Sequence, residues 1–183
     1  GGNKALNAVT EAFNTGDEKT QEASLMALAA FNDKNAAAAL IKIARDTKNT
    51  TFLNTALQGY LRAIRASSAP AEQKLLMLRN AMEVAQSITQ KIQIIKASEQ
   101  AKCLNAIFFA GQYLNDVNLQ QTAANAVMNI TMAGQYEGDL IKNLLNQTIA
   151  VITGPDSGYQ KEGMRKYISS MKEGAGFVSI FNG

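Results

Sequence analysis

Four basic side chains are the clearest candidates for ligand binding in this sequence. Arg62 and Arg65 are three residues apart, and Lys42 and Arg45 share that spacing in the preceding segment. Residues three apart lie on one face of a helix, so each pair would place two positive charges together. The spacing predicts a small basic patch, and the favoured alternative is that these side chains pair with Asp46 and with glutamates, or keep the surface soluble.

Tyrosines are the second group of candidates, because an aromatic face can stack on a sugar ring or another apolar ligand. Tyr60 and Phe108 follow apolar stripes of helical spacing, so we assign them to the core. Tyr136 and Tyr159 fall outside these stripes and are predicted to be surface contacts for a ligand.

Residues suited to catalysis are scarce. The sequence has no His, the commonest acid–base catalyst and metal ligand near neutral pH. Glu72 and Glu83 are far apart, and Asp139 suits a helix start, so solvated faces are favoured over a paired glycosidase site. The single cysteine, Cys103, reads as a small core residue. Phosphate-binding and dinucleotide-binding glycine motifs are absent from the sequence, and we expect no catalytic residue, no metal site and no cofactor.

Composition points to an all-α protein that does not bind nucleic acid and does not span a membrane. Of 183 residues, 46% are hydrophobic, aromatic residues are few, Trp is absent and only two are Pro, which favours close-packed helices. The formal charge of +3 comes from charges of both signs that alternate along the chain, unlike a nucleic-acid-binding groove. No apolar run approaches the roughly 20 residues of a membrane span.

Apolar residues recur with a period near 3.6 in four segments, within 36–44, 53–64, 141–152 and 164–171. Start signals add further helices: Asp17 before Glu18, Pro70 opening a segment to Ala85, and Ser87 with Gln90 as a capping box. Short polar or Gly-bearing breaks separate the segments. We therefore predict eight or nine helices, with successive helices antiparallel.

A faint repeat suggests how these helices are arranged. The segment from Asn54 resembles the segment from Gln121, about 67 positions later, and each follows a shorter predicted helix. Reuse of a helix pair in this way is typical of a solenoid, so we predict a stack of antiparallel helix pairs.

Residues 82–130 resemble HEAT-like repeats of bacterial multidomain proteins. The similar residues run from Met82-Glu83-Val84-Ala85 through Ala101 to Leu114 and on to Ile130, with Ser98-Glu99-Gln100 in place of the usual turn glycine. The resemblance implies a HEAT/armadillo-like α-solenoid that acts as a scaffold. It would occupy residues 3–173, after Gly1-Gly2, which we interpret as a tag remnant.

The last eight residues, Gly176-Phe177-Val178-Ser179-Ile180-Phe181-Asn182-Gly183, alternate like a β-strand. They resemble the opening strand of the 3-keto-disaccharide hydrolase family, a concanavalin-like β-sandwich. The resemblance implies that residues 174–183 are a linker and the first strand of a downstream domain. It also implies a non-catalytic arm of a secreted or periplasmic glycan-acting hydrolase, with that sandwich as its partner.

Two alternatives stay open. In the first, the helical region is a module that binds a carbohydrate or another protein in its own right. In the second, it is an enzyme similar to the HEAT-like alkylpurine DNA glycosylases, whose clefts use Trp and basic residues. The absence of Trp and the modest charge disfavour that second alternative.

Overall fold

The structure, a computed structural model, describes residues 2–31 and 34–172. All regular structure in these two ranges is α-helical, which confirms the all-α prediction. Ten helices lie within them, so the expected number of eight or nine is wrong. The helix α1 is not among the segments that the apolar spacing or the start signals predict. The helices are α1 (Gly2–Thr15), α2 (Glu18–Ala30), α3 (Lys34–Asp46), α4 (Thr50–Ala66), α5 (Ala71–Val84), α6 (Ile88–Ser98), α7 (Leu104–Gly111), α8 (Gln120–Gly134), α9 (Asp139–Val151) and α10 (Ser157–Ser170).

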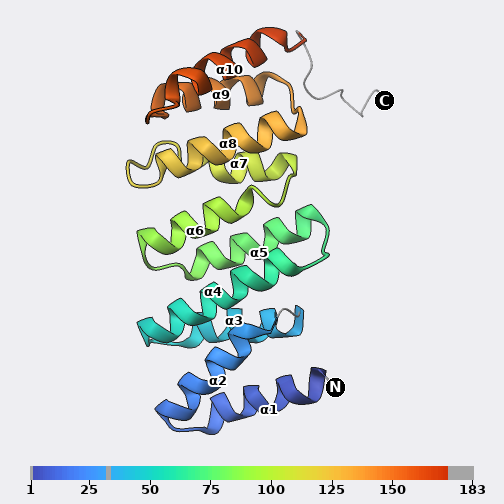
Figure 1. The fold of residues 1–183 in the computed structure, drawn as a ribbon, viewed down its shortest axis with the longest axis vertical. Helices are drawn as coiled ribbons and strands as arrows, with labels where there is room; N and C mark the ends of the chain where they lie inside the picture. The colour runs from blue at the N-terminus through green and yellow to red at the C-terminus, as the bar shows by residue number, and fades with distance from the viewer. Residues whose placement is uncertain (1, 32–33, 173–183) are drawn as a thin grey trace, which may run out of the picture. The chain divides into compact units, whose positions relative to one another are not determined.

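The helices group into two compact units, Gly1–Ala97 and Ser98–Gly183. In unit 1, α1 packs on α2, α2 and α3 pack on α4, and α5 packs on α3 and α4 (Figure 1). The apolar stripe predicted for 53–64 faces these contacts, and Leu53, Leu57 and Tyr60 on it are buried with Leu40 of α3. This core fixes α4 at the centre of unit 1.

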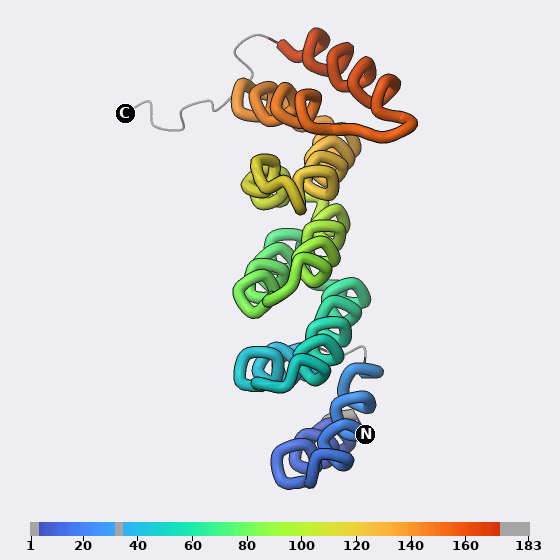
Figure 2. Tube along the Cα trace, turned by 90° about the vertical axis from the view of Figure 1, so that its left-hand side faces the viewer, coloured from blue at the N-terminus to red at the C-terminus, as the bar shows by residue number. Residues whose placement is uncertain are grey.

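In unit 2, α8 packs on both α7 and α9, and α10 packs on α9 (Figure 2). Small residues on α8 allow this close approach, since Ala123, Ala124 and Ala126 are buried. Larger side chains fill the remaining core, among them Ile107 of α7 and Leu145 of α9. The helix α8 therefore has the same central position in unit 2 that α4 has in unit 1.

Two predicted helix starts are confirmed in atomic detail. The Asp17 carboxylate accepts a hydrogen bond from the Thr20 N–H at 2.9 Å and caps α2. Before α6, the Gln90 N–H donates to Ser87 Oγ at 3.2 Å, and the Ser87 N–H donates to Gln90 Oε1 at 3.0 Å. These reciprocal bonds form the capping box that the sequence predicts. The N–H groups in the first turn of a helix have no partner within the helix. The side chains of Asp17, Ser87 and Gln90 accept hydrogen bonds from such groups at the starts of α2 and α6.

Side chains near the starts of α4 and α8 reach a later helix. Asn54 of α4 accepts a hydrogen bond from Gln90 Nε2 of α6 at 2.6 Å. In unit 2, Gln121 of α8 donates to the Val151 carbonyl at 2.6 Å and accepts from the Thr153 N–H at 2.9 Å, just before α10. Asn54 and Gln121 are the first residues of the two segments that resemble each other in sequence.

Side chains toward the helix ends reach back to an earlier helix end. Arg62 of α4 donates to the Ala29 carbonyl at the end of α2, at 3.1 Å. Asn129 of α8 donates to the Glu99 carboxylate, just beyond α6, at 2.9 Å. Asn129 follows Arg62 by 67 positions, the interval of the sequence repeat. Residues at matching positions of the two similar segments therefore both bond to a group 30 or 33 residues earlier in the chain.

Two local predictions have different outcomes. Cys103 is buried, as expected, but it precedes α7 instead of lying inside a helix, because Lys102 has a left-handed backbone with φ of 45°. The strand predicted for 176–183 lies outside the described residues.

Candidate functional site

A groove in unit 1 contains Lys42, one of the four basic candidates. It has a volume of about 480 Å³ and lies among α1, α2, α3 and the turn that leads into α4. Phe13 and Phe52 form an aromatic contact in its lining, with ring centroids 5.9 Å apart. We call this the Lys42 groove; its lining residues are Thr10, Phe13, Asn14, Glu18, Gln21, Ala39, Lys42, Ile43, Asp46, Thr47, Lys48, Asn49 and Phe52.

Polar groups in the lining surround the aromatic pair. Lys42 Nζ lies 2.7 Å from Asp46 Oδ2, so its charge is already partnered by a carboxylate one turn away. The Asn49 side chain caps α4 by accepting from the N–H groups of Thr51 and Phe52. Asn14 and Gln21 add amide groups that can donate and accept hydrogen bonds. The groove can therefore hold a polar ligand by hydrogen bonds and by packing on an aromatic ring.

The four basic candidates do not form one patch. Arg45 lies in the last turn of α3 and pairs with Glu83 of α5, with 3.7 Å between Arg45 Nη2 and Glu83 Oε2. Arg62 donates to the Ala29 carbonyl, and Arg65 is exposed one turn further along α4. A rise of about 1.5 Å per residue puts Arg62 roughly 18 Å beyond the start of α4. Lys42 and Arg45 therefore lie at one end of the α3–α4 contact, and Arg62 and Arg65 lie toward the other.

The charge of Arg45 also acts on a buried tyrosine. Tyr60 is almost fully buried in α4, and this burial raises the pKa of its phenol. A hydrogen bond with the Asn80 side chain and the positive charge of Arg45 oppose the rise in pKa. Tyr60 thus belongs to the core, as predicted, and its hydroxyl is satisfied between helices.

The two tyrosine candidates differ in their surroundings. The Tyr136 hydroxyl donates to the Lys102 carbonyl at 3.1 Å, and the Tyr136 carbonyl accepts from the Tyr167 hydroxyl at 3.1 Å. The Tyr136 ring lies directly over Gly134, where an added Cβ would come within 2.1 Å of it. Tyr159 is 87% exposed on α10. Tyr136 therefore joins the turn at Lys102 to α10, while the Tyr159 ring is open to solvent.

A pocket in unit 2 was not predicted from the sequence. It has a volume of about 390 Å³ and lies between α7 and the start of α9. We call it the Phe108 pocket; its lining residues are Leu104, Phe108, Glu137, Gly138, Asp139, Leu140 and Ile141. Phe108 was assigned to the core, yet it is only half-buried and lines this pocket. The residue from which this pocket could have been predicted is Leu140, a large apolar residue that lies off the buried stripe of α9.

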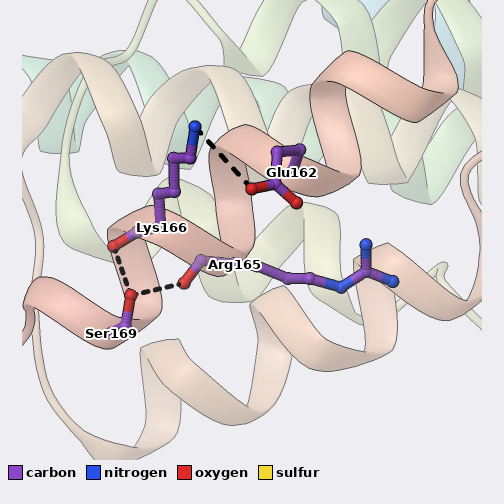
Figure 3. Close-up of polar contacts among 4 residues, drawn as sticks. All are labelled: Glu162, Arg165, Lys166 and Ser169. Atoms are coloured by element: carbon purple, nitrogen blue, oxygen red, sulfur yellow. Dashed lines mark hydrogen bonds and ion pairs between the residues drawn. The ribbon is translucent and has the colours of Figure 1, made fainter.

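The surface of α10 carries charges that are largely matched within the helix. Lys166 Nζ lies 3.7 Å from Glu162 Oε1. The Ser169 hydroxyl is within hydrogen-bond distance of the carbonyls of Arg165 and Lys166, and Figure 3 shows these contacts. The Arg165 guanidinium extends away from these groups (Figure 3). Exposed pairs of this kind contribute little to stability or to binding.

Two other kinds of site, a metal site and a membrane-spanning helix, are absent from the described ranges. Within residues 2–31 and 34–172, no three His, Cys, Asp or Glu residues lie close enough together to hold a metal ion. No helix in the same ranges is both long enough and apolar enough to cross a membrane.

Comparison with known proteins gives no match: no protein-family model, no curated protein and no solved structure is significantly similar to the chain.

Proposed function

We propose that this chain is a non-catalytic scaffold built as a HEAT-like solenoid, in which the even-numbered helices stack in parallel and each is preceded by an antiparallel partner. The observation that carries the proposal is the set of hydrogen bonds made by α4 and α8. Asn54, near the start of α4, bonds to Gln90 in the first turn of α6, and Gln121, near the start of α8, bonds to Val151 at the end of α9 and to Thr153 in the connection to α10. Toward the ends of the same two helices, Arg62 bonds to Ala29 in the last turn of α2, and Asn129 bonds to Glu99, just after α6. This pattern is what stacked repeats require.

The spacing of these bonds supports a repeat of about 33 residues. The bonded partners are 30 to 36 residues apart in sequence, in both units. The Tyr167 hydroxyl, which bonds to the Tyr136 carbonyl 31 residues earlier, extends the pattern to α10. Small-angle scattering of the full chain tests the solenoid. A stack of five pairs would have a radius of gyration clearly above the roughly 16 Å of a compact domain of this length, and a value near 16 Å would contradict it.

The scaffold binds its ligand, in this proposal, in the Lys42 groove. An aromatic pair beside amide groups suits a protein segment, whose backbone can bond to Asn14 and Gln21. The same groups suit a glycan, whose hydroxyls bond to amides and whose ring stacks on Phe13, the half-buried ring of the pair. A protein segment is the first candidate, and a carbohydrate-binding module is the second.

Nuclear magnetic resonance titration of the full chain distinguishes these ligands. The probes are a panel of oligosaccharides and an unbiased peptide library. We expect either the oligosaccharides or the peptides to shift the resonances of Asn14, Lys42 and Phe52. Lys42→Gln combined with Asn14→Ala should weaken that binding, whereas Lys96→Gln, an exposed change on α6, should leave it unchanged. An unchanged affinity in the double variant of Lys42 and Asn14 would show that the Lys42 groove is not the binding site.

The wider context of the scaffold is a separate part of the proposal. The resemblance of residues 176–183 to the opening strand of the 3-keto-disaccharide hydrolases suggests an arm beside a glycan-acting sandwich domain, in a secreted or periplasmic protein. Only the residues quoted for this resemblance support it. Genomic sequence around the coding region tests it directly: a continuation into alternating strands with polar and Trp clusters would support the arm, and a continuation into further helices would contradict it.

A further inference from the structure

The Phe108 pocket has an apolar floor that is partly open to solvent. Leu104 and Phe108 lie one turn apart on α7, and Leu140 and Ile141 lie in the first turn of α9. Ile141 is buried, but 52% of Leu140 is exposed. An apolar side chain placed here would remove surface of Leu140 and Phe108 from water, which favours binding.

Two carboxylates flank this apolar floor. Glu137 and Asp139 stand on either side of Gly138, and both are exposed. Among the described residues, neither carboxylate has a basic side chain within 4.0 Å. The lining of the pocket contains no Lys or Arg, and the nearest basic residue on α9 is Lys142, beyond the lining residues. The rim is therefore negatively charged, although Asp139 also interacts favourably with the start of α9.

We propose that the Phe108 pocket binds a protein segment that presents a large apolar side chain, Leu, Met or Phe, with Lys or Arg within one helical turn of it. The apolar side chain fills the space between α7 and α9, and the basic groups meet Glu137 and Asp139. Opposite charges at the rim select the partner and its orientation. The same charges repel nucleic acid and anionic lipid surfaces, which leaves a basic protein segment as the fitting partner.

This inference rests on the proposed scaffold function and deepens it, but it uses residues of unit 2 only. The Lys42 groove belongs to unit 1, so resonances of the two sites report on them separately. If the Phe108 pocket fails to bind, the titration of the Lys42 groove still stands as a test of the scaffold.

The test uses the full chain and three synthetic 14-residue helical peptides. The first carries two Leu four residues apart, each with Lys three residues away; the second has Glu in place of Lys; the third has Ser in place of Leu. We expect the first peptide to shift resonances of Leu104, Phe108 and Leu140. We expect the second and third peptides to bind at least about tenfold more weakly, because each lacks one half of the recognition.

Variants of the chain identify the pocket. Glu137→Gln with Asp139→Asn should weaken the first peptide about three- to tenfold, since each exposed ion pair contributes modestly. Leu140→Ala should weaken it by about fivefold or more. Because Leu140 is half exposed, this variant should fold normally, and a dispersed spectrum verifies that it does.

Matched controls lie elsewhere on the chain. Leu76→Ala changes a Leu of similar exposure, 57%, on α5, and Glu162→Gln removes an exposed carboxylate on α10. Neither should alter the affinity of the first peptide. Equal binding of the Leu-to-Ser peptide, an unchanged affinity for Leu140→Ala, or the absence of any shift at Phe108 would each overturn the proposal.

Discussion

Gln90 donates a hydrogen bond from its Nε2 to Oδ1 of Asn54 over 2.6 Å, while its own Oε1 accepts from the backbone N–H groups of Gln86 and Ser87. One buried side chain thus caps the start of α6 and ties it to α4. Its removal would leave two backbone donors without a protein partner. Such donors are costly when they are shielded from water.

Gln90→Ala should therefore lower the free energy of unfolding by about 2 kcal/mol or more, and Asn54→Ala by about 1 kcal/mol. Chemical denaturation of the two single variants and the double variant measures the coupling between them. We expect a coupling free energy above about 0.5 kcal/mol. Strictly additive effects would show that the bond does not contribute to stability.

Glycine substitutions in two helices should have opposite effects. Gly59 of α4 faces α2, and a Cβ there would lie 2.7 Å from Ala29 Cβ and 2.8 Å from Ala29 Cα. Gly59→Ala should cost about 1–3 kcal/mol, because the backbone of α2 must move away. At Gly163 of α10 the nearest atom, Met132 Cε, is 3.9 Å from an added Cβ. Gly163→Ala should stabilise by up to about 1 kcal/mol through helix propensity. Thermal melting of both variants tests this pair, and equal effects would refute the tight α2–α4 contact.

Two buried threonines provide a second matched pair. Thr131 of α8 is buried, and among the described residues its hydroxyl has no hydrogen-bond partner. Thr148 of α9 is equally buried, but its hydroxyl donates to the Leu144 carbonyl at 2.8 Å. Thr131→Val should therefore stabilise the chain by about 1 kcal/mol, and Thr148→Val should gain less or destabilise. Denaturation in urea measures the free energy of unfolding of both variants. If Thr148→Val were the more stable variant, the Thr131 hydroxyl would not be the unpartnered one.

The cap on α2 should make stability depend on pH. The hydrogen bonds from Thr20 hold the pKa of Asp17 below its ordinary value of 3.8. A carboxyl whose pKa is lower in the folded state stabilises fully above its unfolded pKa, and this contribution is lost as the pH falls through the folded pKa. Asp17→Asn keeps an acceptor without the charge, so its melting temperature should lie below that of the wild type at pH 7 and approach it below pH 3. A constant difference across this range would count against the linkage.

The helices were predictable where the sequence carries both a stripe and a cap. The stripe from Leu53 to Ile64 and the box of Ser87 and Gln90 locate α4 and α6 well. The first helix, α1, was not predicted, because neither the apolar spacing nor the start signals that located the other helices were found in its segment. The turn before Cys103 was missed because a left-handed Lys102 is set by tertiary contacts, including the bond from Tyr136 to its carbonyl.

The sites were harder to predict than the helices. Lys42 and Arg62 were grouped from their spacing on neighbouring helices, but spacing does not say which end of a helix each occupies. Phe108 was placed in the core because its position fits a stripe, yet the short α7 leaves it at an edge. A pocket depends on which side chains fail to meet, and this depends on the packing of several helices at once.

The burial of Tyr60 has a spectroscopic consequence. The chain has no Trp, so its intrinsic ultraviolet emission comes from five tyrosines, and Tyr60 is the only one within residues 1–97. Tyr60→Phe would leave emission from residues 98–183 alone, and the difference from the wild type would report the unfolding of unit 1. Two separate transitions would show that the two units unfold independently, and a single transition would show that they unfold together. No added label is needed for this measurement.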